Sequence, residues 1–292
     1  MKHAFIFEHH EQFSIATMCR VLGVSRQAYY LWRKRPVSER AQRDQELTRL
    51  IEHLFHANKE SYGSPRIHLE LKLQGVRCGQ KRVARLMKQQ QLRACAPRRF
   101  VVTTDSDHTW PLAENVLNRA YQVEAISDVN CTWAGDITYI PTAQGWLYLA
   151  VVLDLKSRKV IGWSMANSME QTLVHDALQM ALERRGLADA QGQLLFHSDR
   201  GSQYAANDYQ KRLHQHGIVC SMSRKGNCWD NAPVESFFAT LKKEWVHRHK
   251  YLTREQAKAS LFTYIEVFYN RKRRHSALGY LSPHDYEQNL LN

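Results

Sequence analysis

The order of apolar segments in the second half of the chain restricts its fold more than any other feature. Three β-rich runs follow one another with short breaks, at residues 132–141, 146–153 and 160–166, and they predict an antiparallel meander. Helices and strands then alternate. The expected helices cover residues 169–185, 205–216 and 232–245, and the expected strands cover residues 194–197 and 218–222. This order predicts an α/β layered fold.

The first third of the chain has a helical pattern instead. One predicted helix ends at Gly23, and Ser25 is placed to cap a second helix over residues 26–33. A similar pair of helices follows, the second over residues 80–90. Such helix-turn-helix-like units suit DNA, because an α-helix fits the major groove and its basic side chains reach phosphates and bases. The candidate DNA-contacting residues on these helices are Arg26, Arg33, Arg82, Arg85 and Lys88.

The positive charge of the chain is concentrated in this helical region. The net charge is +13, from 41 Lys and Arg against 28 Asp and Glu. Residues 1–100 hold 20 of the basic residues and 8 of the acidic ones, so the rest of the chain is nearly neutral. Such a field attracts polyanions, and double-stranded DNA is the expected partner. The alternative is a well-solvated basic surface over ordinary helical hairpins.

Pattern and charge divide the 292 residues into four parts. Residues 1–95 are expected to form a helical DNA-binding region, and residues 131–250 the α/β core. Between them, residues 96–130 show no lasting periodicity and are interpreted as a linker. Residues 251–292 are expected to form a helical basic extension.

Composition excludes several classes of protein. Hydrophobic residues make up 43% of the chain and charged residues 24%, as in a folded globular protein. No apolar run is long enough to span a membrane, and the first residues do not resemble a secretory signal. The six cysteines form no CxxC pair, so neither a disulfide framework nor structural zinc is expected, and a reducing cytoplasm fits best.

Three carboxylates stand where the predicted strands would bring them together. Asp136 lies within the first strand, Asp199 follows the fourth, and Glu235 opens the helix after the fifth. If the first and fourth strands are neighbours, Asp136 and Asp199 point into one crevice. Carboxylate oxygens are the ligands that Mg²⁺ prefers. Three of them can hold two ions about 3.5–4 Å apart, an arrangement used in phosphodiester chemistry.

Each acid also has a purely structural interpretation. Asp136 could be a bulge carboxylate, although burial among apolar neighbours is costly without a partner or a cation. Asp199 could form an Asx turn. A capping box is disfavoured at Glu235, because the residue three positions earlier is Ala232. A further acid, Asp154, ends the second strand and is interpreted as a turn residue.

Four motifs occur in order along the chain. They are residues 133–139 (WAGDITY), 197–204 (HSDRGSQY), 231–237 (NAPVESF) and 269–283 (YNRKRRHSALGYLSP). Together they resemble the transposases of the insertion-sequence-three family, specifically the product of its second reading frame (OrfB). The resemblance covers essentially the whole chain.

The resemblance implies an RNase H-like core with an Asp-Asp-Glu triad. Asp136, Asp199 and Glu235 would be the catalytic residues and the metal ligands. The 35 residues between Asp199 and Glu235 are typical of this family and of retroviral integrases. The family's basic residue seven positions after the glutamate is matched by Lys242, which shares a helical face with Glu235 and is expected to contact DNA phosphate. Arg274, in the last motif, is a further candidate DNA contact.

The implied activity is metal-dependent cleavage of transposon ends followed by strand transfer. Two Mg²⁺ ions, or Mn²⁺ in their place, are the implied cofactors. The implied partners are double-stranded DNA at the element ends and target, a first-reading-frame fusion partner, and further copies of the chain. The implied location is the bacterial cytoplasm, in association with the nucleoid, with no membrane partner.

The sequence departs from related proteins in two respects, and two other functions are considered. The chain lacks the His-His-Cys-Cys spacing of the retroviral zinc module, so no zinc is expected, and it lacks a heptad run, so it corresponds to the catalytic half of the family's product. An RNase H-type nuclease would not need the basic first third. A DNA-binding regulator with an inert core would be expected to lose an acid, and all three are present.

Overall fold

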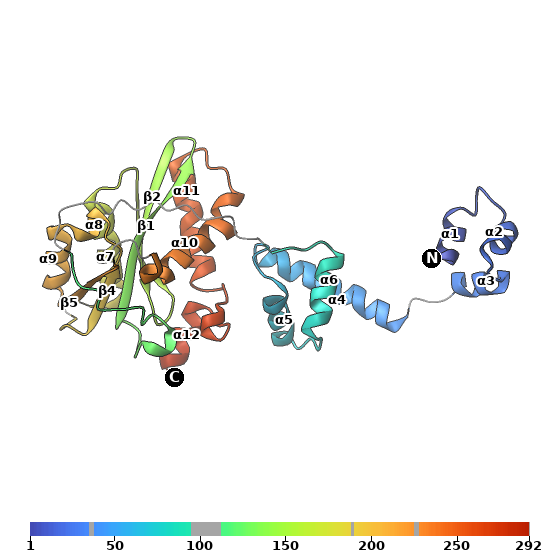
Figure 1. Ribbon diagram of the computed structural model, residues 1–292, viewed down its shortest axis with the longest axis horizontal. Helices are drawn as coiled ribbons and strands as arrows, with labels where there is room; N and C mark the ends of the chain where they lie inside the picture. Colours follow the sequence, from blue (N-terminus) through green and yellow to red (C-terminus); the bar gives the residue numbers. More distant parts are fainter. Residues whose placement is uncertain (35–37, 95–111, 188–189, 225–227, 292) are drawn as a thin grey trace.

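The structure is a computed structural model that describes residues 1–34, 38–94, 112–187, 190–224 and 228–291 (Figure 1). Its main element is a five-stranded sheet with the strand order β3-β2-β1-β4-β5. The strands are β1 (Thr132–Thr142), β2 (Gly145–Asp154), β3 (Val160–Ala166), β4 (Leu194–Ser198) and β5 (Ile218–Met222). These strands match the five that the sequence predicts.

Both kinds of strand pairing occur in this sheet. The first three strands form the predicted antiparallel meander, β1 with β2 and β2 with β3. Strand β4 then pairs in parallel with β1, and β5 pairs in parallel with β4. Parallel neighbours need a crossover connection, and residues 199–217, which contain two helices, provide it between β4 and β5. Helix α7 (Gln171–Arg185) leads from β3 at one edge of the sheet to β4.

Helices cover both faces of the sheet, as Figure 1 shows. Helices α7, α8 (Ser202–Ala205) and α9 (Asn207–Gln215) lie on one side, and α10 (Ala232–Glu244) and α11 (Arg254–Phe262) on the other. Consecutive side chains of a strand point to opposite faces, so Trp133 joins the core under α7 and Ala134 the core under α10. The result is the α/β RNase H-like arrangement that the sequence analysis predicts.

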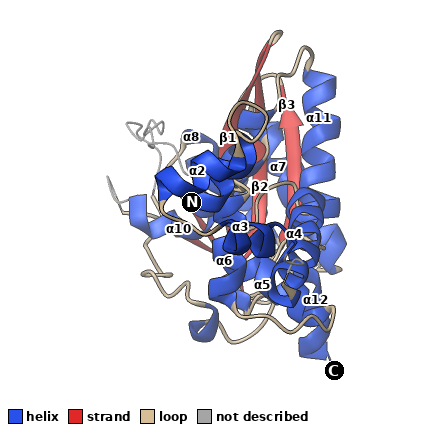
Figure 2. Ribbon diagram, turned by 90° about the vertical axis from the view of Figure 1, so that its right-hand side faces the viewer, coloured by secondary structure: helices blue, strands red, loops and turns tan. Residues whose placement is uncertain are grey.

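Helix α7 approaches the sheet closely because of one glycine. A Cβ atom on Gly162 of β3 would lie 2.1 Å from the carbonyl oxygen of Ala177. On the opposite face, Figure 2 shows α11 alongside β3, where the rings of Trp163 and Phe262 meet edge to face at 6.0 Å.

Two small helical units make up the first third of the chain. Helices α1 (Lys2–Glu8), α2 (Ile15–Leu22) and α3 (Arg26–Lys34) share one apolar cluster, and α4 (Glu39–Ala57), α5 (Ser64–Leu73) and α6 (Gln80–Gln89) share another. The predicted helix signals are confirmed: Gly23 ends α2 in the left-handed conformation, and the Ser25 hydroxyl accepts the Ala28 N–H. Helix α1 was not expected from the sequence.

Two of the expected domain boundaries differ from the packing. The first part of the expected linker, residues 96–111, lies outside the described residues. The second part, residues 112–130, packs on the sheet domain, with Leu117 and Ile126 buried in the core beneath α10. It contains one short helix, η1 (Val123–Ala125). This half of the segment is therefore not a free linker.

The expected extension over residues 251–292 also belongs to the core. It contains α11, a π-helix (η4, Thr263–Tyr269), η5 (Ser276–Leu278) and α12 (Pro283–Leu291). Leu261 and Tyr264 are fully buried in the same cluster as α10. The side chain of Asn270 bonds both backbone groups of Val160 in β3, at 3.0 and 2.9 Å. The segment completes the sheet domain.

The α4–α6 unit touches the sheet domain through this last segment. The Tyr62 hydroxyl donates to the Lys272 carbonyl at 3.1 Å and accepts the Arg274 backbone N–H at 3.0 Å. Arg274 also forms an ion pair with Glu70 of α5. Within the described ranges, no helix combines the length and apolarity needed to cross a membrane.

Candidate active site

Asp136 and Asp199 lie side by side where the parallel pairing of β1 and β4 ends. The last pair of that ladder joins Gly135 to Ser198, and each acid is the next residue along its strand. The side chains of Phe196 and Tyr204 crowd Gly135, where a Cβ atom would lie 2.6 Å from the Phe196 ring. The β1–β4 ladder thus places Asp136 beside Asp199, as the sequence analysis predicted.

Asp199 also makes the predicted turn. Its Oδ1 accepts the backbone N–H of Gly201 at 2.9 Å. The Asx turn and a place in the acidic cluster are compatible, because a carboxylate has two oxygens and several lone pairs.

Glu235 reaches this cluster through the start of helix α10. Asn231, the residue before the helix, donates from Nδ2 to the Gly135 carbonyl at 3.3 Å, which ties the helix start to β1 beside Asp136. Glu235 follows in the first turn of α10 and is half-buried. Its carboxylate has no hydrogen-bond or ion-pair partner among the residues that the structure describes.

The neighbouring carboxylates raise the pKa values of Asp136 and Glu235. Burial raises the pKa of Asp136 well above its ordinary value, and the neighbouring charges of Asp199 and Glu235 raise it further. Burial and the charge of Asp199 also raise the pKa of Glu235. Like charges held together in this way are stabilised by a bound cation.

Lys242 lies on the same side of α10 as Glu235. Its ammonium group sits 4.6 Å from the centre of the Tyr139 ring, a cation–π contact that the sequence analysis did not anticipate. Burial lowers the pKa of Lys242, and the charge of Asp136 opposes that effect. Lys242 is therefore held near the acids without forming an ion pair with them in the described part of the chain.

The acids fit a divalent metal by chemistry, although their side chains are not yet arranged around one. Among the described residues, no three Asp, Glu, His or Cys side chains are placed as ligands of a single ion. The carboxylates nevertheless repel one another, and oxygen ligands of this kind suit Mg²⁺ or Mn²⁺. A shared centre therefore requires the side chains of Asp136, Asp199 and Glu235 to adopt another arrangement than the one described.

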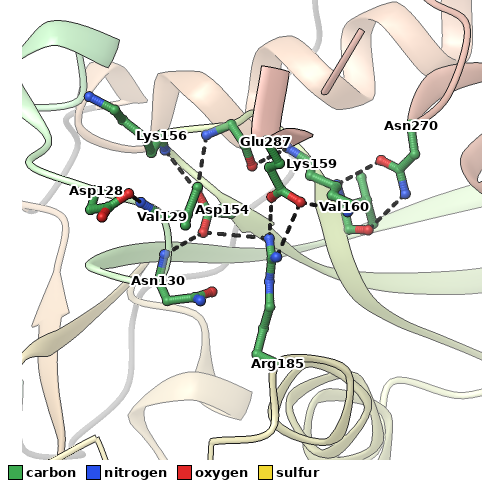
Figure 3. A network of polar contacts seen from close by, with 11 residues as sticks. Asp128, Val129, Asn130, Asp154, Lys156, Lys159, Val160, Arg185, Asn270 and Glu287 are labelled. Carbon is green, nitrogen blue, oxygen red and sulfur yellow. Dashed lines mark hydrogen bonds and ion pairs between the residues drawn. The ribbon is translucent and has the colours of Figure 1, made fainter. Parts of the chain in front are cut away.

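The spare acid Asp154 has a structural role, which confirms its interpretation as a turn residue (Figure 3). It is fully buried at the end of β2, and its oxygens accept the backbone N–H groups of Asn130, Lys156 and Ser157 at 2.8–3.1 Å. Arg185 lies 3.7 Å from it. Asp154 is thus occupied and plays no part in the acidic cluster.

Sequence reasoning missed Asp230, which fixes the loop before α10. This buried carboxylate accepts hydrogen bonds from Asn115, Arg119 and Arg224 at 2.8–2.9 Å. The side chain of Arg224 contributes most to holding the pKa of Asp230 well below its ordinary value. Its only sequence signal is its position directly before the NAPVESF motif.

The candidate DNA contacts fall into two groups. Arg26, Arg33 and Lys88 are exposed on α3 and α6. Arg82 and Arg85, also on α6, form ion pairs of 2.6 and 2.7 Å with Asp44 of α4. Arg274 is engaged by Glu70. The guanidinium groups of Arg82, Arg85 and Arg274 therefore already have a carboxylate partner. The DNA-binding role of these residues and of the exposed group stays a prediction.

Three family profiles match parts of this chain. The sequence profile described as "Integrase core domain" matches residues 127–228, and a second profile with the same description matches residues 216–283. A profile described as "HTH-like domain" matches residues 42–100. Between them they cover the second helical unit and the sheet domain.

Full-length relatives are bacterial. The chain is 46% identical to transposase InsF for insertion sequence IS3A of Escherichia coli (strain K12), over 293 residues and 100% of both chains. It is 44% identical to the insertion element IS600 uncharacterized 31 kDa protein of Shigella sonnei, over 91% of this chain and 96% of that one.

Retroviral integrases are among the similar solved structures. The catalytic core domain of BIV integrase is 16% identical, with a TM-score of 0.39, over 56% of this chain and 96% of that one. The HTLV-2 integrase catalytic core domain in complex with magnesium is 17% identical, with a TM-score of 0.41, over 54% and 96%.

The integrase-core matches fall on the residues that build the sheet and carry the acids. The fold and the site thus define an integrase-type enzyme that acts on DNA. At 46% identity over its whole length to transposases of insertion sequence IS3, the chain belongs to the IS3 family of transposases. As a transposase with an integrase core and a helix-turn-helix-like domain, it binds DNA, cleaves it and transfers strands.

Proposed function

We propose that Asp136, Asp199 and Glu235 are the catalytic residues and the metal ligands of this transposase. The observation that carries the proposal is the meeting of all three acids at the end of the β1–β4 ladder, where neighbouring carboxylates raise the pKa values of Asp136 and Glu235. Two Mg²⁺ ions, or Mn²⁺ in their place, are the proposed cofactors; when bound, they supply Lewis-acid stabilisation of the attacking and leaving oxygens.

The chain's own residues position the reacting groups. Asp136 is fixed within strand β1, and Asp199 directly after β4 by its hydrogen bond from the Gly201 N–H. Glu235 is fixed by the first turn of a helix tied to β1. In the first step water attacks a phosphodiester at the element end, and the bond to the 3′ oxygen breaks to leave a free 3′-hydroxyl. In the second step that hydroxyl attacks a target phosphodiester and displaces its 3′ oxygen. No side-chain nucleophile is required.

The decisive experiment is strand transfer with purified full-length chain and oligonucleotides that carry the element's terminal repeats. With Mg²⁺ or Mn²⁺, we expect joined products and no covalent protein–DNA adduct. Hydrolysis without joining would instead identify a nuclease.

Lys242 is proposed to hold a phosphate of the element end beside the acids. Lys242→Ala should slow joining by about 10-fold, because a charge-assisted hydrogen bond contributes about 1.5 kcal/mol. Joining kinetics with pre-cleaved ends measure this effect. Lys243→Ala is the matched control, since one residue along the helix turns about 100° away from the site. Equal effects of the two substitutions would remove the specific role of Lys242.

The helical units are proposed to bind duplex DNA through their free basic side chains. Replacing Arg26, Arg33 and Lys88 by Gln should reduce the slope of log K against log salt by about 0.9 for each phosphate that is no longer neutralised. Replacing Arg82 and Arg85 should reduce it less, because Asp44 already neutralises part of their charge. Binding titrations at several salt concentrations measure both slopes. A larger change from the Arg82/Arg85 pair would contradict this ranking.

The remaining proposals concern assembly and location. Residues 1–95 are proposed as the DNA-binding region and residues 131–250 as the catalytic part, with residues 96–130 between them and residues 251–292 completing the core. A first-reading-frame fusion partner and further copies of the chain on DNA are the proposed partners. The proposed location is the bacterial cytoplasm, at the nucleoid.

A further inference from the structure

A cavity of about 440 Å³ lies beside helix α10 and outside the acidic cluster. Its walls come from α5 of the second helical unit, the turn between β2 and β3, the first turns of α10, and residues 269–277. A volume of this size is typical of ligand sites. Because α5 supplies one wall and the sheet domain supplies the others, the cavity lies between the second helical unit and the sheet domain.

Three guanidinium groups line this cavity, those of Arg66, Arg158 and Arg273. Arg273 is neutralised by Glu244, which accepts two hydrogen bonds from it at 2.7 and 2.8 Å. Neither Arg66 nor Arg158 has a carboxylate within 4.0 Å in the described part of the chain. The cavity therefore carries an excess of about two positive charges.

The two uncompensated arginines are fixed by other contacts. Arg66 lies over the ring of Tyr62, 5.4 Å from its centre. Arg158 donates to the carbonyl oxygen of Tyr121 at 2.6 Å, and its own carbonyl oxygen accepts the Tyr269 hydroxyl at 3.1 Å. Both side chains are half-buried. Their positions are thus set before any ligand arrives.

The electrostatics of the cavity reflect this excess of charge. Burial, followed by the charge of Arg273, lowers the pKa of Arg66, and burial lowers the pKa of Arg158. Burial and the nearby arginines hold the pKa of His275 well below its ordinary value, so the imidazole is neutral. Cations kept from water without a counter-charge are costly.

Three of the surrounding acids are committed to other partners. Glu244 binds Arg273, Glu70 binds Arg274, and Asp154 is held by backbone N–H groups and Arg185. The charges of Asp154 and Glu124 reach Arg158, and that of Glu244 reaches Arg66, only at longer range. Arg66 and Arg158 are therefore left without a directly contacting counter-charge among the described residues.

We propose that the cavity binds a phosphate group of the DNA strand that is processed at the acidic cluster. Ser236 and Thr240 add hydroxyl donors to the wall, and Ser236 directly follows Glu235 on α10. Ser236 faces about 100° away from Glu235 around the helix, so a strand engaged by Glu235 would have to pass around α10 to enter the cavity. One phosphate held by both Arg66 and Arg158 would add a further link between the helical unit and the sheet domain.

This inference rests on the proposed function, and its test is made without divalent metal, so that catalysis plays no part. Full-length chain is titrated with duplex DNA in EDTA at several salt concentrations. Its thermal unfolding is followed in inorganic phosphate and in chloride at equal ionic strength. The variant is the double substitution Arg66→Gln/Arg158→Gln, and Arg184→Gln is the control, because Arg184 is paired with Glu266 outside the cavity.

Inorganic phosphate should raise the Tm of the unaltered chain by about 2–4 °C, and the double variant should not show this gain. The DNA-binding salt slope should fall by about 0.9 in the double variant, for one phosphate that is no longer neutralised, and stay unchanged in the control. Arg66→Lys/Arg158→Lys, which keeps both charges, should restore most of the slope.

Three outcomes would overturn the proposal. A phosphate-specific gain in Tm with an unchanged DNA slope would assign the cavity to a free phosphate-containing ligand. The absence of both effects would remove the site. Equal salt slopes for the double variant and the Arg184→Gln control would mean that the change in DNA affinity comes from the loss of positive charge in general and not from this cavity.

The proposed function is tested separately, because loss of strand transfer in the triad variants says nothing about phosphate binding in the cavity.

Discussion

Asp136→Asn, Asp199→Asn and Glu235→Gln are each expected to abolish cleavage and strand transfer, with rates at least about 1,000-fold below those of the unaltered chain. Losing one metal ligand removes several kcal/mol of transition-state charge stabilisation, and each 1.36 kcal/mol is tenfold in rate. DNA affinity should change little, because the substitutions remove negative charge and leave the basic side chains intact. Gel assays of cleavage and joining, alongside binding titrations, measure both quantities.

Asp208→Asn is the matched control for the triad variants. It removes one exposed carboxylate from the first turn of α9 in the same domain. Its activity should equal that of the unaltered chain. Near-normal strand transfer by any one of the three triad variants would remove that residue from the catalytic centre.

Glu244→Gln is expected to destabilise the fold by about 3–5 kcal/mol, because it leaves a buried guanidinium without its counter-charge. Glu244 and Arg273 form a buried bidentate ion pair, with Glu244 only 5% exposed and Arg273 6%. Removing the negative partner of such a pair costs far more than removing one partner of an exposed pair. Urea unfolding followed by tryptophan fluorescence measures the free energy of unfolding.

Glu255→Gln provides the comparison for this effect. Glu255 pairs with Lys258 at 2.7 Å on the exposed side of α11, with 80% of its side chain accessible. Exposed pairs of this kind contribute about 0–1 kcal/mol. If Glu244→Gln costs no more than Glu255→Gln, the buried pair does not stabilise the packing of the last segment against α10.

The sheet domain could be predicted closely from local sequence pattern. Its strands are continuous apolar runs bounded by turns, and buried strands with short connections give a strong signal. The position of Asp136 beside Asp199 followed once β1 and β4 were assumed to be neighbours. The helix after β5 was equally clear, which placed Glu235 in its first turn and Lys242 two turns later on the same face.

The packing of the irregular segments could not be predicted in the same way. Residues 112–130 lack periodicity because they pack on the core as turns and one short helix, held by isolated anchors such as Leu117 and Ile126. The Arg119–Asp230 pair joins residues 111 positions apart. Contacts of this kind leave no repeat in the sequence, and only the folded chain brings the partners together.

The pairing of basic residues was likewise outside the reach of sequence. Arg82 and Arg85 show the helical spacing of a DNA-facing surface, but Asp44 on another helix lies against them. The same limit applies to Tyr139, whose ring supports Lys242. Spacing along one element predicts a shared face and does not predict which neighbouring element covers it.

The central claim is that Asp136, Asp199 and Glu235 form one metal centre. Anomalous diffraction from crystals of the full-length chain soaked in Mn²⁺ tests it most directly, because it locates the ions without depending on activity or on the element's terminal repeats. The expected result is anomalous density enclosed by the three carboxylates, and its loss in the Asp136→Asn variant. Mn²⁺ bound only elsewhere, or density that persists unchanged in that variant, would contradict the claim.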